Sequence, residues 1–182
     1  MKNIEKVTND DLMSFSNLTL VNCTLDVIYN GVTYPVVLSQ REDYANQSDS
    51  TLWDWLVLGN RSAVFDDARR IFKFKFHKQE PNRIYYHIWG TSDRSAKKIA
   101  RSDKGYLGMY VSADAKNPWK LQPLEWDGKR LRCFLRDHDG NRATVGEYPE
   151  SAGRYIGAAG GYVEHLNTFA EGVCEFFVTP VG

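Results

Sequence analysis

Val57-Leu58-Gly59 is the first of three short hydrophobic triplets in this chain. The other two are Tyr106-Leu107-Gly108 and Tyr155-Ile156-Gly157, and the final glycines at positions 59, 108 and 157 follow one another at intervals of 49 residues. Self-similarity at a fixed period is typical of repeat proteins, whose units pack against their copies to bury hydrophobic edges. The spacing predicts a threefold internal repeat in which each triplet ends a short strand and its glycine lets the chain turn into a loop.

Turn signals recur at intervals close to that of the triplets. A tight-turn pair precedes each one, at Asn30-Gly31, Pro81-Asn82 and Asp127-Gly128. Asn-Gly suits a two-residue hairpin because both central positions need a positive φ. Alternating hydrophobic stretches flank these pairs, as expected of strands. The expected hairpins join residues 25–28 to 36–38, 72–76 to 84–89, and 119–124 to 131–135.

Long polar segments follow the hairpins, at residues 39–50, 92–104 and 136–151. In the second segment, helix-forming residues follow a Ser-Asp start from Ser92 to Arg101, which predicts a surface turn or a short inserted helix. This region is also basic. Its cations fit either a solvated loop or a patch that meets a phosphate or an acidic partner. They are Arg94, Lys97, Lys98, Arg101 and Lys104.

The last unit carries the most specific motif, Gly153-Arg154-Tyr155-Ile156-Gly157-Ala158, followed by Glu175-Phe176-Phe177. It is similar to a Gly-x-Tyr-Leu-x-Ala motif followed, after a variable loop, by Glu-x-Phe, and Lys104-Gly105-Tyr106-Leu107-Gly108 is a weaker copy. On these residues the chain resembles the β-trefoil superfamily. It resembles the fascin-like branch more than the ricin-B-type lectins, because the Gln-x-Trp motif of those lectins is absent.

The resemblance implies an all-β fold. A β-trefoil, a pseudo-threefold barrel, would occupy residues 18–182 as a single domain, with a short N-terminal extension at residues 1–17. A propeller fits less well, because three units are too few to close one. Members of the superfamily are mostly binding modules, among them lectins, protease inhibitors, cytokines, actin-bundling domains and receptor-binding parts of toxins. The fold alone does not choose among these functions.

Composition narrows the expected partners and location. Lysine plus arginine and aspartate plus glutamate both total 23, so there is no basic excess of the kind that nucleic-acid binders usually show. The sequence contains no apolar run long enough to span a membrane and no signal-peptide pattern, so we expect no membrane insertion and a cytoplasmic location. Cys23, Cys133 and Cys174 are far apart and odd in number, which is typical of reduced thiols packed in a core.

No pattern of catalytic or metal-binding residues stands out. The four histidines, at positions 77, 87, 138 and 165, lack the spacing or the neighbouring cysteines of a zinc site. A nucleophile motif such as Gly-x-Ser-x-Gly is also absent. We therefore expect no enzymatic activity, no catalytic residues, no metal and no cofactor.

The most ligand-like cluster is Asp137-His138-Asp139-Gly140-Asn141. Its carboxylates and amide could bind the hydroxyl groups of a sugar, and the same residues suit a polar turn between strands. An EF-hand loop beginning at Asp137 would need glutamate at its twelfth position, where the chain has Tyr148, so calcium binding in that mode is excluded. Trp89, directly before Gly90 and a polar loop, fits either a ring that stacks on a sugar or a core aromatic.

The leading hypothesis is a non-enzymatic, lectin-like protein that binds carbohydrate or a glycoprotein through loops of the threefold barrel. Its expected ligand-binding residues are Trp89, Asp137, Asp139 and Asn141. The alternative is a protein-binding trefoil, such as a protease inhibitor or a cytoskeletal or toxin-associated module. Because the three polar loops differ in charge, at most one or two of three related sites are expected to bind the same ligand.

Overall fold

The computed structural model describes residues 20–38, 54–59, 70–103, 105–111, 115–147, 164–168 and 174–182. The N-terminal extension predicted for residues 1–17 and the third triplet at residues 155–157 lie outside these ranges. The described residues form twelve strands and one 3-10 turn and contain no α-helix, which confirms the predicted all-β class. The strands are β1 (Leu20–Tyr29), β2 (Val32–Leu38), β3 (Leu56–Leu58), β4 (Ile71–Glu80), β5 (Arg83–Trp89), β6 (Lys97–Arg101), β7 (Leu107–Val111), β8 (Trp119–Trp126), β9 (Leu131–Arg136), β10 (Thr144–Glu147), β11 (Glu164–Asn167) and β12 (Glu175–Pro180); the 3-10 turn η3 is Ser92–Arg94.

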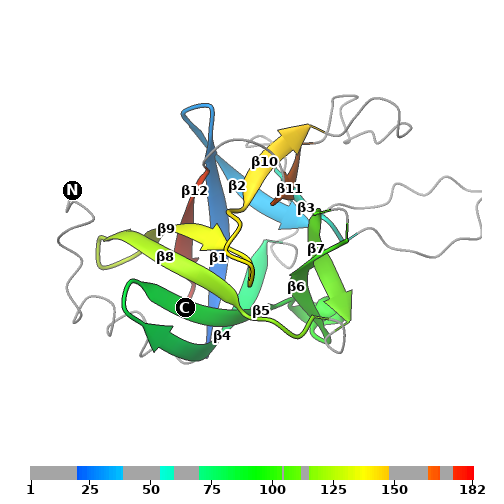
Figure 1. Cartoon of the computed structure of the whole chain (residues 1–182), viewed down its shortest axis with the longest axis horizontal. Helices are drawn as coiled ribbons and strands as arrows, with labels where there is room; N and C mark the ends of the chain where they lie inside the picture. The colour runs from blue at the N-terminus through cyan, green and yellow to red at the C-terminus, as the bar shows by residue number, and fades with distance from the viewer. Residues whose placement is uncertain are drawn as a thin grey trace, which may run out of the picture.

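Six strands close an antiparallel barrel (Figure 1). Each pairs with the next in the order β1, β4, β5, β8, β9, β12, and β12 pairs with β1 again. Closure gives every one of these strands a partner on both sides, so none presents a free edge for aggregation.

The other six strands form three hairpins beside the barrel: β2 with β3, β6 with β7, and β10 with β11. Backbone contacts join the hairpins to one another. β3 pairs with β11, Trp55 forms a bridge to Gly108 in β7, and the Thr168 amide after β11 donates to the Gly105 carbonyl before β7. In Figure 1 the three hairpins lie together, with β10 and β11 above β6 and β7.

The pairing follows the same order three times along the chain. In the four-strand segments β1–β4, β5–β8 and β9–β12, the first strand pairs with the fourth and the second with the third. The fourth strand of each segment then pairs with the first strand of another segment. As a result, the β5–β6 and β9–β10 linkers occupy corresponding places in the second and third segments.

Turn chemistry fixes the hairpins as the sequence predicts. Asn30 and Gly31 both have positive φ, 49° and 74°, as a two-residue primed turn requires. Asn82, with φ 61°, follows Pro81 in the β4–β5 turn, and Gly128 has φ 89° in the β8–β9 turn. The three expected hairpins, β1–β2, β4–β5 and β8–β9, are therefore confirmed.

Alternating side chains fill the barrel. Along β4, Phe72 and Phe74 are fully buried, whereas Lys73 and Lys75 are exposed. The same alternation gives β12 a buried Phe176 and Val178. The three cysteines are buried and free, as predicted for core thiols.

We expect Cys23 and Cys133 to resist alkylation in the folded protein. Burial raises the pKa of both thiols, that of Cys23 to about 12, and the thiolate is the reactive form. Peptide mapping after iodoacetamide treatment at about pH 8 should find these cysteines labelled only when denaturant is added. Fast labelling of either one without denaturant would contradict their burial.

The segment predicted as a surface turn or short helix is mostly a strand. Only Ser92–Arg94 form a 3-10 turn, and Lys97–Arg101 form β6. All five residues of β6 pair with β7, and Ile99 is buried. Hairpin pairing with the neighbouring strand β7 therefore outweighs the helix propensity of alanine and lysine. The polar segment at residues 136–151 likewise contains a strand, β10.

The glycine of the second triplet does not end its strand. Leu58 ends β3 and Gly59 follows, as predicted, but Gly108 is the second residue of β7. A Cβ atom at Gly108 would lie 3.0 Å from the carbonyl oxygen of Asp54. The residue therefore permits the close approach of two hairpins, a different role from the predicted turn.

Candidate functional site

The cluster that begins at Asp137 forms the turn between β9 and β10. Two backbone bonds close it: the Asp137 amide donates to the Asn141 carbonyl at 3.0 Å, and the Gly140 amide donates to the Asp137 carbonyl at 3.1 Å. The Asp137 carboxylate also accepts from the Asn141 amide at 2.8 Å and from the Asn141 side-chain amide at 3.0 Å. Gly140 supplies the positive φ, 93°, that the turn needs. Asp137 and Asn141 thus hold the shape of the turn.

One guanidinium ties this turn to β6. Arg101 donates to Asp137 Oδ2 at 2.6 Å and to Asp139 Oδ2 at 2.9 Å. The Asp137 side chain is only 2 % exposed, whereas that of Asp139 is 50 % exposed. Charge-assisted bonds of this kind are among the stronger hydrogen bonds in proteins. Arg101 therefore joins a buried carboxylate and a surface carboxylate.

Side chains of β8 and β9 also bind the turn. The ammonium group of Lys120 donates to the His138 carbonyl at 2.5 Å. Arg136 donates to the Gly140 carbonyl at 2.7 Å and to the side chain of Gln122 at 3.0 Å. The turn is thus fixed by cations from three strands.

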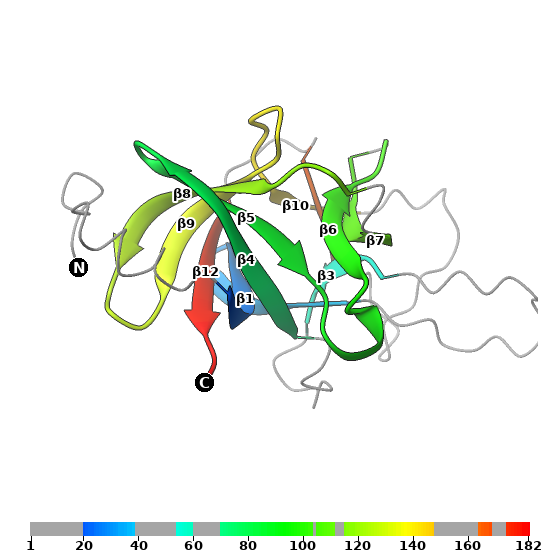
Figure 2. The same ribbon diagram turned by 90° about the horizontal axis from the view of Figure 1, so that it is seen from below.

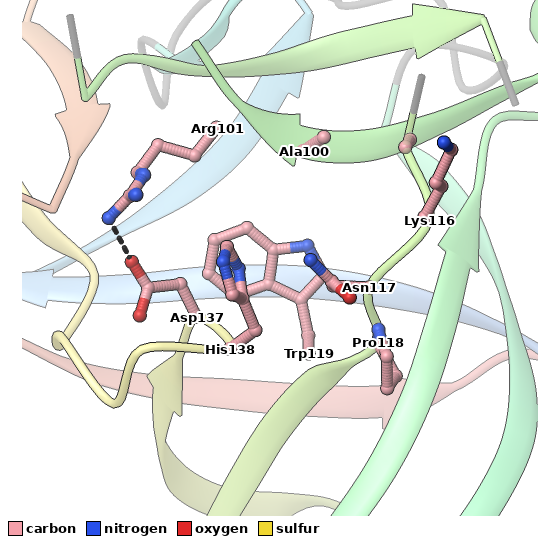
Figure 3. Close-up of a pocket in the computed structure, with 9 residues that line it drawn as sticks. Ala100, Arg101, Lys116, Asn117, Pro118, Trp119, Asp137 and His138 are labelled. Carbon is pink, nitrogen blue, oxygen red and sulfur yellow. Dashed lines mark hydrogen bonds and ion pairs between the residues drawn. The ribbon is translucent and has the colours of Figure 1, made fainter. Parts of the chain in front are cut away.

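A pocket of about 80 Å³ opens between this turn, β6 and the segment that leads into β8. Figure 3 shows Arg101 and Asp137 on one side and Lys116, Asn117 and Pro118 on the other, with Trp119 between them. The indole nitrogen of Trp119 donates to the Ile99 carbonyl at 2.8 Å, which fixes the ring against β6. The lining residues are Ala100, Arg101, Ala115, Lys116, Asn117, Pro118, Trp119, Asp137 and His138.

The rim of the pocket offers both donors and acceptors. Lys116, Asn117 and His138 are exposed, and Asp139 stands next to His138 with an Nε2–Oδ1 distance of 3.3 Å. A ligand hydroxyl has one donor and two acceptor positions, which an amide, an imidazole and a guanidinium can satisfy together. The described residues contain no group of three or more potential metal-ligating side chains. The rim therefore offers hydrogen-bonding groups from Asn117 and His138 beside the ammonium group of Lys116.

The structure brings Asp137, Asp139 and Asn141 together in one turn, where only Asp137 of the three lines the pocket, and places Trp89 elsewhere. Trp89 ends β5, does not line the pocket, and has the ammonium group of Lys98 5.0 Å from its ring centroid. Its indole nitrogen is buried and has no hydrogen-bond partner in the described part of the chain. Lys98 therefore lies over the ring that was predicted to stack on a sugar.

The basic stretch predicted within residues 92–104 does not form one patch. Arg94 and Lys97 both bind the buried carboxylate of Asp54, at 2.5 Å and 2.6 Å. Lys98 is the next residue along β6, and successive strand residues point to opposite faces. Lys104 lies outside the described residues.

The sequence did not indicate Lys116, Asn117 or Pro118 as site residues. It placed Arg101 only in the basic stretch, with no link to Asp137, which is 36 residues further along the chain. The pocket is assembled from three separate segments that only the folded barrel brings together. No local motif marks that assembly.

Comparisons with known proteins identify no relative of this chain. No helix among the described residues has the length and apolar character that crossing a membrane requires. None of the protein-family models matches this chain, and the comparisons with curated proteins and with solved structures gave no match either.

Proposed function

We propose that the chain is a β-trefoil protein. The six-strand barrel, the three hairpins that contact one another, and the threefold order of pairing support this assignment. Under it, the turn at Asp137 and the linker after Trp89 are equivalent loops of two repeats. The two loops differ in sequence. This difference explains why the turn at Asp137 lines the pocket and the linker after Trp89 does not.

We propose that the protein binds carbohydrate, in a lectin-like and non-catalytic manner, at the pocket beside Arg101. The observation that carries the proposal is that one turn, fixed by bonds from three strands, presents polar side chains at the rim of a pocket. A fixed site loses little conformational entropy when it binds, which favours even weak polyol ligands.

Each rim residue has a defined role in this proposal. Asn117 and His138 bind sugar hydroxyls directly, and Asp139 accepts from a hydroxyl with the part of its carboxylate that solvent reaches. Asp137 holds Arg101 in place from behind and does not contact the ligand, because its side chain is 2 % exposed. Pro118 supplies the apolar surface that a sugar ring needs on one side.

A glycan array tests the proposal, followed by calorimetric titration of the best-bound glycan. We expect the double variant Asn117→Ala/His138→Ala to bind that glycan about tenfold or more weakly, because each lost hydrogen bond contributes about 1 kcal/mol. Both side chains are exposed, so unfolding should be nearly unchanged. Lys129→Ala, in the β8–β9 turn, is the matched surface control and should bind as the unmodified protein does.

Two results would contradict the carbohydrate proposal. One is an array without a hit at high protein concentration. The other is unchanged affinity in the Asn117→Ala/His138→Ala variant.

A protein-binding role is the second candidate. The pocket volume, about 80 Å³, is well below the roughly 300 Å³ at which small-molecule sites begin, and so favours a partner that covers the surface around it. Affinity capture with immobilised protein distinguishes the two roles. A stoichiometric partner that remains bound in excess free sugar, and is lost from the Asn117→Ala/His138→Ala variant, would support protein binding.

A further inference from the structure

A second group of charged side chains lies on the outer face of β4, β5 and β6. Figure 2 shows β4 and β5 side by side, with β6 beyond the end of β5. We call this group the basic face, and none of its members lines the pocket. Its members are Lys73, Lys75 and His77 on β4, His87 on β5 and Lys98 on β6.

Strand register brings these lysine and histidine side chains together. Lys75 pairs with His87, and the rings of His77 and His87 lie with centroids 5.2 Å apart. Trp89 is the cross-strand partner of both Lys73 and Lys98. The three lysines and two histidines therefore lie on one continuous face, with an aromatic ring between two of the lysines.

The side chains of the basic face have no ion-pair partner among the described residues. None of its five members forms an ion pair there, whereas the other two cations of β6, Lys97 and Arg101, each bind an aspartate. Lys73, Lys75 and His77 are exposed, and Lys98 is 9 % exposed. Cations held together without a carboxylate repel one another.

The pKa shifts of His87 and Lys98 agree with the lack of ion-pair partners on the basic face. Burial lowers the pKa of His87, and the charges of Lys98, His77 and Lys75 lower it further. Burial also lowers the pKa of Lys98, with a further contribution from Lys75. A bound anion would relieve this repulsion and favour the charged forms.

We propose that the basic face binds the sulfate esters of an acidic polysaccharide. Ammonium groups are compact cations with three donors each, which suits oxyanions approached from different directions. Alternate residues of a strand lie about 7 Å apart, so the row along β4 offers positive charge at regular intervals to a chain of repeated anions. The proposal goes beyond carbohydrate binding at the pocket, because it uses different residues and a different chemical group.

The small area of the face argues against a nucleic-acid duplex as its partner. Its five side chains cover only parts of three neighbouring strands. A duplex instead presents its phosphates along a stiff, extended backbone. A flexible sulfated chain can concentrate its charge on such a small area.

Titration with dextran sulfate tests the proposal, with unsulfated dextran as the matched probe. We expect dextran sulfate to bind, dextran not to bind, and the affinity to fall as salt is added. The variant Lys73→Gln/Lys75→Gln should bind dextran sulfate about tenfold or more weakly, from about fivefold per lysine. Both side chains are exposed, so the variant should unfold as the unmodified protein does.

The control Lys129→Gln/Arg130→Gln removes the same charge from the exposed β8–β9 turn and should change the affinity less than twofold. An equal loss in this control would overturn the proposal, because attraction would then depend on net charge alone. Absence of dextran sulfate binding at low salt would also overturn it. So would tighter binding of an oligothymidine of equal charge that the same lysine variant abolishes.

The variants separate this inference from carbohydrate binding at the pocket. Lys73→Gln/Lys75→Gln should leave the affinity for the best-bound array glycan unchanged, and Asn117→Ala/His138→Ala should leave the affinity for dextran sulfate unchanged. A failure at one surface is therefore distinguishable from a failure at the other.

Discussion

Replacement of Asp54 by alanine is expected to lower the free energy of unfolding by about 3–5 kcal/mol. The Asp54 side chain is 2 % exposed and its carboxylate binds Arg94, at 2.5 Å, and Lys97, at 2.6 Å. The Arg94 side chain is itself only 13 % exposed. Removal of the carboxylate leaves a largely buried guanidinium without its main counter-charge, and that is the costly outcome for a buried ion pair.

The backbone around this ion pair leaves little room for rearrangement. A Cβ atom at Gly90 would lie 2.7 Å from the Arg94 carbonyl oxygen, so the 3-10 turn is packed directly against the end of β5. The Asp54 carbonyl also accepts from the Met109 amide at 2.8 Å. Among the described residues, Arg94 forms ion pairs with the buried Asp54 and with the surface residue Asp93.

Asp93→Ala is the matched control for Asp54→Ala. Asp93 binds the same guanidinium at 2.8 Å, but its side chain is 67 % exposed, so its loss should cost less than about 1 kcal/mol. Chemical denaturation of the two variants and the unmodified protein measures both effects. Similar small losses in both variants would show that the Asp54 ion pair contributes little to stability.

Asp54 and Asp137 connect different four-strand segments in the same way. Asp54, just before β3, binds Arg94 and Lys97 near β6, and Asp137, just after β9, binds Arg101 at the end of β6. Each arginine also binds a second aspartate at the surface. β6 and the turn before it therefore join the first segment to the second and the second to the third.

Local chemistry explains which parts of the fold the sequence predicts. Asn30-Gly31 and Pro81-Asn82 specify their turns because positive φ is tolerated by few residue types, and that preference acts within two residues. The alternation of Phe72 and Phe74 with Lys73 and Lys75 specifies a strand with one buried face. These signals need no knowledge of the rest of the chain, and the hairpins they predict are confirmed.

Contacts between separate segments explain what the sequence does not predict. β6 contains one large apolar residue, Ile99, between lysines and alanine, and its strand conformation comes from pairing with its chain neighbours β7 and β5. Gly108 was expected to end a strand, but the carbonyl of Asp54, more than 50 residues earlier in the chain, explains why glycine is needed there. Contacts of this kind leave no pattern within either segment.

The sequence likewise predicts one part of the candidate site and misses the other. The turn at Asp137 follows from the preference of aspartate, glycine and asparagine for such positions, and the sequence located it. Its link to Arg101 and the pocket beside Asn117 arise only from tertiary packing. The basic face is also assembled across three strands, and its lysines are ordinary solvent-facing residues in the sequence.

Replacement of Asp137 by alanine is the second large effect, again about 3–5 kcal/mol in the free energy of unfolding. The variant removes the acceptor of Arg101 at 2.6 Å and both Asn141 bonds, at 2.8 Å and 3.0 Å. The β9–β10 turn then loses the side-chain bonds between Asp137 and Asn141, and the partly buried guanidinium of Arg101 keeps its bond to Asp139. Glycan binding should fall together with stability, because this turn carries side chains that line the pocket.

Asp139→Ala separates the structural role from recognition. Its side chain is 50 % exposed, so its loss should cost less than about 1 kcal/mol of stability while removing one acceptor for a ligand hydroxyl. Denaturation and titration of the same samples should therefore show Asp137→Ala unstable, and Asp139→Ala stable but several-fold weaker in glycan binding. If Asp137→Ala unfolded at the same denaturant concentration as Asp139→Ala, Asp137 would not be the residue that holds Arg101 and the turn in place.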